Sequence, residues 1–216
     1  KELAKILKIE ESKITPKNLA KLTKLSLSRK GIRSIQGLEH CTALKSLDLQ
    51  FNQIEDLSPI AELEKLETLL PYGNPFKVVP DLSALKKVKD LNFYQCRSLR
   101  DISGLKGMTW LETLLLERVE LKDISPVVGL VNLKSLDLRF NQIEDLSPIV
   151  NMGKLENLNV DNNLIQKVPD LSKLIYITLL SFQNNHLRDI SGLKAMDGLE
   201  TLNITNNPML SDLAPL

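Results

Sequence analysis

The chain has 216 residues, of which 28 are Lys or Arg, 27 are Asp or Glu, and 43% are hydrophobic. This near balance of charge, without a long run of either sign, argues against a surface for nucleic acid or anionic membranes. No stretch approaches the ~20 apolar residues of a membrane-spanning helix, so we expect no membrane insertion within this chain.

The first 21 residues precede the regular part of the sequence and predict a small helical cap. Residues 2–7 and the segment from Thr15 have helical character, with Thr15 as the N-cap and Pro16 at the first helical position. Apolar residues in this segment would cover the open end of a repeating core, as a terminal repeat must. We therefore assign residues 1–21 to an N-terminal cap.

From Leu22 onward the sequence repeats itself every 22 residues, nine times. Aligned on the first leucine, the blocks read L-x-x-L-x-L-x-x-N-x-I, which is the specific signature of leucine-rich repeats. Only the blocks that begin at Val88 and Leu199 carry one extra residue. We assign residues 22–216 to nine repeats. They begin at Leu22, Leu44, Leu66, Val88, Leu111, Leu133, Leu155, Ile177 and Leu199.

Each block predicts one short strand and one returning segment. The alternation of apolar and polar residues in L-x-x-L-x-L indicates a strand with one buried face, and stacking such strands ~4.8 Å apart gives a continuous leucine core. The returning half has apolar residues at three-residue spacing, typical of short 3₁₀ turns. The sequence therefore predicts an α/β solenoid: a leucine-rich repeat horseshoe with a concave parallel β-sheet and 3₁₀ turns on the convex side. Six asparagines would point inward and satisfy backbone groups: Asn52, Asn74, Asn141, Asn163, Asn185 and Asn207.

The sequence also has a longer period, which spans four of the 22-residue repeats. Residues 79–83 return as residues 168–172, and residues 99–106 return as residues 187–194. The simplest explanation is duplication of a four-repeat unit of 89 residues, with a first unit at 44–132 and a second unit at 133–216. Because Leu216 falls inside the ninth repeat, we expect that end of the core to be continued by further sequence or to self-associate with another molecule.

The two cysteines occupy core positions of the repeat. Cys41 stands where other blocks have an inward leucine, and Cys96 stands at the inward asparagine position. They lie more than two repeats apart, beyond the ~7 Å limit for a disulfide. We therefore expect two buried free thiols.

The residue patterns predict no catalytic, cofactor or metal site. The only histidines, His40 and His186, lie about seven strand spacings of ~4.8 Å apart, too far to share a metal. No phosphate-binding glycine loop, nucleophile elbow or zinc spacing occurs. A recurring column of acids is better explained by turn capping than by a cation site. Its members are Asp56, Asp101, Asp123, Asp145, Asp189 and Asp212.

The outward strand positions of the middle blocks differ from the rest. Most outward positions hold Ser, Thr, Asn, Asp or Lys, whereas the middle blocks place aromatic, leucine and charged residues there. Tyrosine and arginine are enriched in binding hot spots, and a contiguous exposed apolar patch usually marks an interface. The alternative is simple packing along the sheet, which we favour for the two phenylalanines. The predicted partner-binding residues are Leu70, Tyr72, Tyr94, Leu115, Glu117 and Arg139, followed by Phe51 and Phe140.

Two irregularities fall in the same region. Pro71 replaces a strand leucine and should remove one hydrogen bond of the ladder. Val119 replaces an inward asparagine and cannot make its hydrogen bonds. Departures from a repeat rule often lie near functional surfaces, although drift explains these two equally well. Trp110 closes the fourth block on the outer side, where we expect it to pack in the widened turn.

The cap and first repeat carry a family resemblance. Residues 14–25 and 31–41, together with the Asp-Leu-Ser-Pro turn and the 22-residue length, resemble bacterial internalin-like leucine-rich repeat proteins. The resemblance covers the whole chain. It implies a protein partner bound on the concave sheet and, for many members, export. The Ig-like module that follows the repeats in several members has no counterpart in this sequence, so the resemblance does not imply adhesion or invasion.

We interpret the chain as a non-enzymatic protein-binding module of a bacterial surface or secreted protein. An alternative is an intracellular, cytoplasmic scaffold that docks a phosphatase or another enzyme, since similar 22-residue repeats occur in a eukaryotic phosphatase regulatory subunit. A weaker alternative is carbohydrate recognition, because Tyr72 and Tyr94 could stack on sugar rings.

Overall fold

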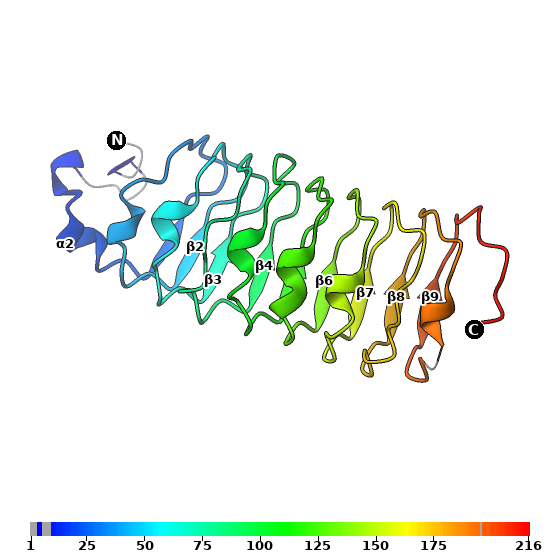
Figure 1. Cartoon of the computed structure of the whole chain (residues 1–216). Helices are drawn as coiled ribbons and strands as arrows, with labels where there is room; N and C mark the ends of the chain where they lie inside the picture. The colour runs from blue at the N-terminus through cyan, green and yellow to red at the C-terminus, as the bar shows by residue number, and fades with distance from the viewer. Residues whose placement is uncertain (1–3, 6–9, 195) are drawn as a thin grey trace.

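The computed structural model describes residues 4–5, 10–194 and 196–216. The repeats stack side by side along one axis, so that the two ends of the chain lie at opposite ends of the molecule (Figure 1). This arrangement confirms the predicted leucine-rich repeat solenoid. The predicted helix at residues 2–7 lies mostly outside the described residues.

Short strands and 3₁₀ turns alternate along the described chain. The strands are β1 (Lys24–Ser26), β2 (Ser46–Asp48), β3 (Thr68–Leu70), β4 (Asp90–Asn92), β5 (Thr113–Leu115), β6 (Ser135–Asp137), β7 (Asn157–Asn159), β8 (Leu179–Ser181) and β9 (Thr201–Asn203). The helical elements are η1 (Glu11–Lys13), α2 (Pro16–Leu19), η2 (Leu38–His40), η3 (Ser58–Ile60), η4 (Ser103–Leu105), η5 (Ser125–Gly129), η6 (Ser147–Ile149) and η7 (Ser191–Leu193).

All paired strands are parallel, but the sheet is interrupted once. Strands β1–β3 form a three-stranded sheet and β4–β9 form a six-stranded sheet. In the regular repeats, the residue after the strand donates its N–H to the next repeat, as Leu49 does to the Leu70 carbonyl at 3.0 Å. Pro71 has no N–H to donate at this position. The ladder resumes at Gly73, whose N–H bonds the Tyr94 carbonyl at 2.9 Å, so Pro71 breaks the sheet locally, as predicted.

One continuous hydrophobic core runs through the stack. A single cluster of buried residues extends from Leu19 in the cap to Leu193 in the eighth repeat. Each of strands β1–β8 contributes a central leucine that is buried, such as Leu47 in β2 and Leu136 in β6. Because each repeat covers the apolar face of its neighbour, the core needs no contacts between distant repeats.

The inward asparagines connect consecutive repeats. The Asn52 side-chain oxygen accepts from the N–H groups of Lys30 and Ile32, both at 3.0 Å, and its amide donates to the Leu27 and Leu49 carbonyls at 2.9 and 2.8 Å. All six predicted asparagines are buried in this way. Within the part of the chain that the structure describes, no buried side-chain nitrogen or oxygen lacks a partner. The asparagines therefore satisfy the backbone where each strand turns away.

The returning segments are 3₁₀ turns in most repeats but not in all. The expectation of such turns is wrong for the third and seventh repeats, where the chain is extended around Val78 and Lys167 and forms isolated bridges with the next repeat. Pro80 and Pro169 follow these segments, and a proline disfavours helical geometry in the residue before it. The same sequence difference therefore has the same structural effect in both units.

A close backbone approach follows each of these extended segments. A Cβ atom on Gly104 would lie 1.9 Å from the Pro80 carbonyl oxygen, and one on Gly192 would lie 1.9 Å from the Pro169 oxygen. Only glycine fits at such a distance. The approach also lets the Leu82 N–H bond the Gly104 carbonyl at 3.1 Å.

The helix predicted to begin after Thr15 is present. Helix α2 begins after Thr15, whose hydroxyl accepts from the Asn18 N–H at 3.3 Å, with Pro16 in the first turn. Leu19 at the end of α2 is buried in the core cluster. The cap thus covers the first repeat through Leu19.

Candidate binding surface

The sheet face is defined here as the outward positions of strands β1–β9 and of the residues that directly follow them. Leu70 and Leu115 end strands β3 and β5. Tyr72, Tyr94, Glu117 and Arg139 each lie two residues after a strand end. All six side chains are partly exposed, as the sequence predicted for outward positions.

Tyr72 lies at the centre of an aromatic contact. Its ring meets the Phe51 ring edge-on, with centroids 5.3 Å apart and planes at 89°. Its hydroxyl donates to the Gln50 side-chain oxygen. On the opposite side, the Arg29 guanidinium lies 4.2 Å from the Phe51 ring centroid. These contacts join the first three repeats into one row of side chains.

Tyr94 does not join this row. Its hydroxyl accepts from the Gln95 side-chain amide at 3.1 Å, and its N–H bonds the Asn92 side chain at 2.8 Å. No ring contact links Tyr72 to Tyr94 among the described residues. The two tyrosines therefore flank the interruption between β3 and β4 without stacking on each other.

Leu70 and Leu115 are also separated. Asn92 of β4 is the register partner of Leu115, and β4 follows β3 along the solenoid. Asp137 of β6 is the partner of Leu115 on its other side. The leucines thus alternate with polar side chains, and the central sheet face is a mixed surface.

Arg139 is held between carboxylates. It bonds Asp137 with its Nε at 2.9 and 3.0 Å and with a terminal nitrogen at 2.7 Å, and it bonds Glu117 at 2.7 Å. The hydrogen bond with Asp137 raises the pKa of Arg139 above its ordinary value. Charge-assisted bonds of this bidentate kind fix the guanidinium plane, so Arg139 presents a rigid charged edge next to Leu115.

Phe51 and Phe140 occupy equivalent positions but differ in their surroundings. Both have left-handed backbone, with φ of 51° and 56°. Phe51 lies on Gly73, where a Cβ would come within 2.6 Å of its ring. Phe140 is 39% exposed, with the Arg118 guanidinium 4.5 Å from its ring centroid. Phe51 packs on the neighbouring loop, as favoured from sequence, whereas Phe140 is open to solvent on one side.

An apolar corner in the seventh and eighth repeats was not identified from the sequence. Ile175, Tyr176 and Leu179 are 68%, 59% and 38% exposed. Comparison of the two units would have found it, because their counterparts in the first unit are charged. Those counterparts are Lys86, Lys87 and Asp90.

The column of acids caps turns, as predicted. Asp56 accepts from the Ser58 N–H at 2.8 Å, and Asp189 accepts from the Ser191 N–H at 2.8 Å. Hydrogen bonds from Ser191 lower the pKa of Asp189, and an ion pair with Lys167 at 3.0 Å lowers it further. The other predicted members bond in the same way. Within residues 4–5, 10–194 and 196–216, no group of three or more His, Cys, Asp or Glu could hold a metal ion.

Both cysteines are buried free thiols, as predicted. Burial raises the pKa of Cys41 and of Cys96 to about 11. The Cys96 thiol donates to the Pro71 carbonyl at 3.8 Å, the contact that an inward asparagine makes in other repeats. Thiols with raised pKa values are poor nucleophiles, so neither is suited to catalysis.

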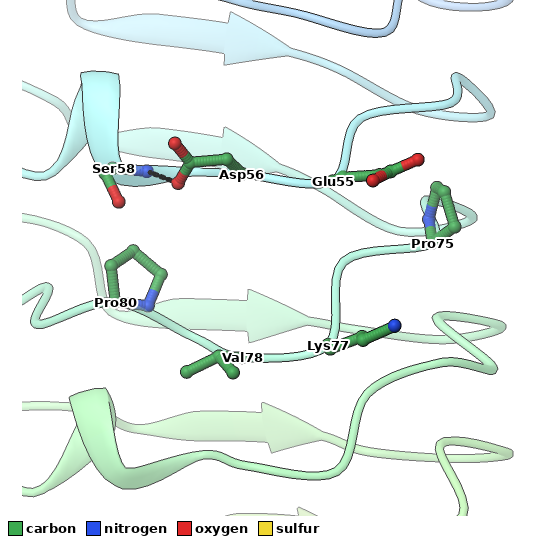
Figure 2. A pocket seen from close by; sticks show the side chains of 7 residues that line it. All are labelled: Glu55, Asp56, Ser58, Pro75, Lys77, Val78 and Pro80. Atoms are coloured by element: carbon green, nitrogen blue, oxygen red, sulfur yellow. Dashed lines mark hydrogen bonds between the residues drawn. The ribbon is translucent and has the colours of Figure 1, made fainter.

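The extended segment before Pro80 leaves a hollow of about 410 Å³ on the outer wall. Figure 2 shows its lining side chains, with Asp56 turned toward the Ser58 N–H and Lys77 extending away from Asp56. The charged side chains of this hollow are exposed to solvent. It therefore lacks the convergent buried polar groups of a ligand site. The full lining is Glu55, Asp56, Ser58, Pro75, Lys77, Val78 and Pro80.

Trp110 packs in the turn that closes the fourth repeat, as expected. Its Nε1–H donates to the Val88 carbonyl at 3.0 Å, and its ring packs against the core. The Lys86 ammonium lies 4.0 Å from the ring centroid. These contacts account for the indole within this molecule.

Comparison with known proteins agrees with this geometry. The family model of leucine-rich repeats in two copies matches residues 20–62, 109–151, 131–173 and 177–216. The chain belongs to the leucine-rich repeat family. Such proteins generally mediate protein–protein interactions. No helix among the described residues is long and apolar enough to cross a membrane.

The similar solved structures include internalins. Internalin C2 of Listeria monocytogenes matches with a TM-score of 0.81 and 30% identity over 93% of this chain and 89% of that one. Internalin InlF of the same species matches with a TM-score of 0.65 and 28% identity, over 99% of this chain and 77% of that one. The predicted resemblance is thereby confirmed, and the chain is an internalin-like leucine-rich repeat protein.

A curated mouse relative is similar over a shorter region. The leucine-rich repeat- and IQ domain-containing protein 1 of Mus musculus is 37% identical over 84 residues, which make up 39% of this chain and 5% of that protein. The chain thus spans only a small part of this relative's length.

Proposed function

We propose that this internalin-like protein is a non-enzymatic module that binds a protein partner through its central sheet face. The observation that carries the proposal is the set of partly exposed aromatic and leucine side chains on β3–β5, at positions where other repeats have small polar residues. Aromatic anchors next to fixed charged groups are typical of interface hot spots. The surface consists of Leu70, Tyr72, Tyr94, Leu115, Glu117 and Arg139, with Phe51 and Phe140 at its edges.

The chemistry of this surface favours a mixed partner epitope. Its N-terminal half offers the Tyr72–Phe51 pair and Leu70, which suit apolar side chains. Its C-terminal half offers Arg139 between Glu117 and Asp137, and Arg118 pairs with Glu117 at 3.7 Å, so two guanidinium groups balance two carboxylates. We therefore expect a partner segment with apolar residues followed by polar or charged residues of both signs. Exposed charges of this kind steer association and fix register more than they add affinity.

The proposed setting is a bacterial surface or secreted protein. It is supported by the likeness to the two Listeria internalins and by the family resemblance of the cap and first repeat. The alternative is a cytoplasmic scaffold that docks an enzyme. Identification of the partner distinguishes the two settings.

The first experiment is partner capture from candidate surface extracts and lysates. The wild-type chain is compared with the double variant Tyr72→Ser/Tyr94→Ser, after circular dichroism shows that both are folded. We expect a protein that the wild type retains and the variant loses. The matched control is Gln183→Ser/Thr205→Ser, which changes the equivalent column after β8 and β9 and leaves the central face intact.

Two results would count against the proposal. A partner retained equally by the wild type and the tyrosine variant would place the interface elsewhere. A partner that is displaced by soluble glycans would favour the carbohydrate alternative, in which Tyr72 and Tyr94 contact sugar rings.

A further inference from the structure

A small hollow opens on the outer side of the second unit, away from the sheet face. Its volume is about 180 Å³. For comparison, an engineered protein cavity of ~150 Å³ binds benzene. The hollow is therefore large enough for an aromatic ring. It is lined by Leu171, Ser172, Leu174, Ile175, Ile177, Met196, Asp197 and Gly198.

The first unit shows which side chain fits this position. Residues 99–114 and 187–202 are the same except at three places, and one of them puts Trp110 in the first unit where the second has Gly198. In the first unit the Trp110 indole packs against the core and donates to the Val88 carbonyl at 3.0 Å. Gly198 has no side chain to do so, and it lines the hollow.

The acceptor for an indole N–H is retained in the second unit. Ile177 is the counterpart of Val88. The Ile177 carbonyl oxygen lies 3.7 Å from the position that a Cβ on Gly198 would take, and no described residue donates a hydrogen bond to it. The Ile175 carbonyl oxygen lies 3.5 Å from the same position, so the hollow combines apolar side chains with carbonyl acceptors that no described residue uses. Trp is the side chain that supplies a large apolar ring and a single donor.

The residue at the rim of the hollow also differs between the two units. In the first unit, Lys86 lies over the Trp110 ring. In the second unit the corresponding residue is Ile175, which lines the hollow and is exposed beside Tyr176. Ile175 belongs to the apolar corner described above. A lysine over the indole ring in the first unit is thus replaced by an exposed apolar side chain in the second. Exposed apolar groups that gather at a hollow indicate an interface.

One charge at the rim selects what lies beside the ring. Asp197 stands where the first unit has Thr109, and it forms no ion pair with any described residue. Its carboxylate would attract a basic group next to the bound ring, because an exposed opposite charge within reach is favourable.

We propose that this hollow binds a tryptophan side chain of a partner protein, flanked by a basic residue that faces Asp197. The indole occupies the space that Trp110 fills in the first unit and donates to the Ile177 carbonyl. Ile175, Tyr176 and Leu179 cover apolar groups of the same partner segment. This site lies outside the central sheet face and does not depend on its function.

The test is an NMR titration of the ¹⁵N-labelled chain with N-acetyl-L-tryptophanamide. We expect concentration-dependent shifts confined to the amides around Ile175, Ile177 and Gly198. The 1-methylindole analogue, which lacks the N–H, should bind at least fivefold more weakly. Absence of shifts at millimolar concentrations, or shifts spread over the whole chain, would overturn the proposal.

A reciprocal exchange between the units provides matched variants. Gly198→Trp should fill the hollow from within and raise the dissociation constant at least tenfold. Trp110→Gly should open a second hollow and add shifts around Val88 and Met108. If Gly198→Trp does not fold, Gly198→Val serves instead, since a Cβ there meets only ordinary contact distances. Unchanged binding by a folded Gly198 variant would contradict the assignment.

Two further probes test the source of the ligand. The dipeptide N-acetyl-Trp-Arg-amide should bind more tightly than N-acetyl-Trp-Glu-amide, and Asp197→Asn should remove most of that difference. Free L-tryptophan carries a carboxylate and should bind more weakly than the amide. Tighter binding of the free amino acid would replace a protein partner by a metabolite and overturn the proposal. Failure of the tyrosine variants on the sheet face leaves all of these outcomes unaffected.

Discussion

The two four-repeat units share a sequence pattern but depart from it on different sides. The second unit has an asparagine at every inward position, namely Asn141, Asn163, Asn185 and Asn207. The first unit replaces two of its four with Cys96 and Val119, and Pro71 interrupts its sheet. The second unit instead departs from the pattern on its outer side, at Ile175 and Gly198.

This difference shows that the two sides of a repeat vary independently. Each repeat contacts only its neighbours, so a substitution in one column alters the local surface without disturbing the stack. In the first unit, Pro71 directly precedes Tyr72, and Cys96 follows Tyr94 by two residues. In the second unit the altered column produces the hollow at Gly198. A repeating scaffold can thus carry more than one candidate surface.

The largest expected effect tests whether the two units are packed alike. Gly104→Ala and Gly192→Ala each place a Cβ 1.9 Å from a proline carbonyl oxygen. Since the backbone must move to accept it, we expect each change to lower the free energy of unfolding by about 3 kcal/mol. Urea denaturation followed by circular dichroism measures this loss. Gly129→Ala is the control, because its Cβ would lie 3.4 Å from its nearest neighbour. A loss in only one unit would show that their packing differs.

The next effect separates the inward positions of the two units. Asn163 bonds the Ile143 N–H at 3.0 Å and the Leu138 and Val160 carbonyls at 2.9 Å. Asn163→Ala leaves these buried groups without partners, so we expect a loss of about 2 kcal/mol in unfolding free energy. Cys96→Ala removes one weak thiol contact and should cost about 1 kcal/mol. Equal losses at the two sites, measured by denaturant titration, would contradict this account of the asparagine ladder.

A smaller difference is expected between the two phenylalanines. Phe51 contacts the Tyr72 ring and lies on Gly73, whereas Phe140 is 39% exposed. Phe51→Leu should therefore lower the unfolding free energy by about 1 kcal/mol, and Phe140→Leu by about half of that. Thermal and urea denaturation of the two single variants checks the order. The reverse order would show that Phe140 packs more tightly than its exposure indicates.

The smallest expected effect is a pH dependence of stability that comes from Glu112, the residue before β5. Hydrogen bonds from Lys134 and Lys89 lower the pKa of Glu112 to about 2 from its ordinary 4.5. A carboxyl group whose pKa is lower in the folded chain stabilises the fold above its ordinary pKa and loses that effect as the pH falls toward 2.

Glu112→Gln should therefore flatten the loss of stability between about pH 4.5 and pH 2. The equivalent residue of the second unit, Glu200, forms no ion pair with any described residue. Glu200→Gln serves as the control and should leave the profile unchanged. The measurement is the urea midpoint as a function of pH. Identical profiles for wild type and Glu112→Gln would remove this difference between the units.

Much of this molecule follows from its sequence. The repeat register, the strands, the inward asparagines, the Asp56-type turns and the break at Pro71 all follow from a pattern repeated nine times. A repeated pattern supports each structural assignment several times, because every position recurs in an equivalent environment. The duplication into two units and the assignment of residues 1–21 as a cap stay proposals.

What the sequence did not provide are contacts between side chains of neighbouring repeats. Periodicity assigns Arg139 to the sheet face, but its clamp between Asp137 and Glu117 depends on rotamers and distances. It gives Phe51 and Phe140 the same role, while Gly73 and Tyr72 pack against only the first. The hollow at Gly198 exists because a missing side chain leaves a space that only neighbours define. A local pattern determines which way a residue points, and the residues packed against it decide what it meets.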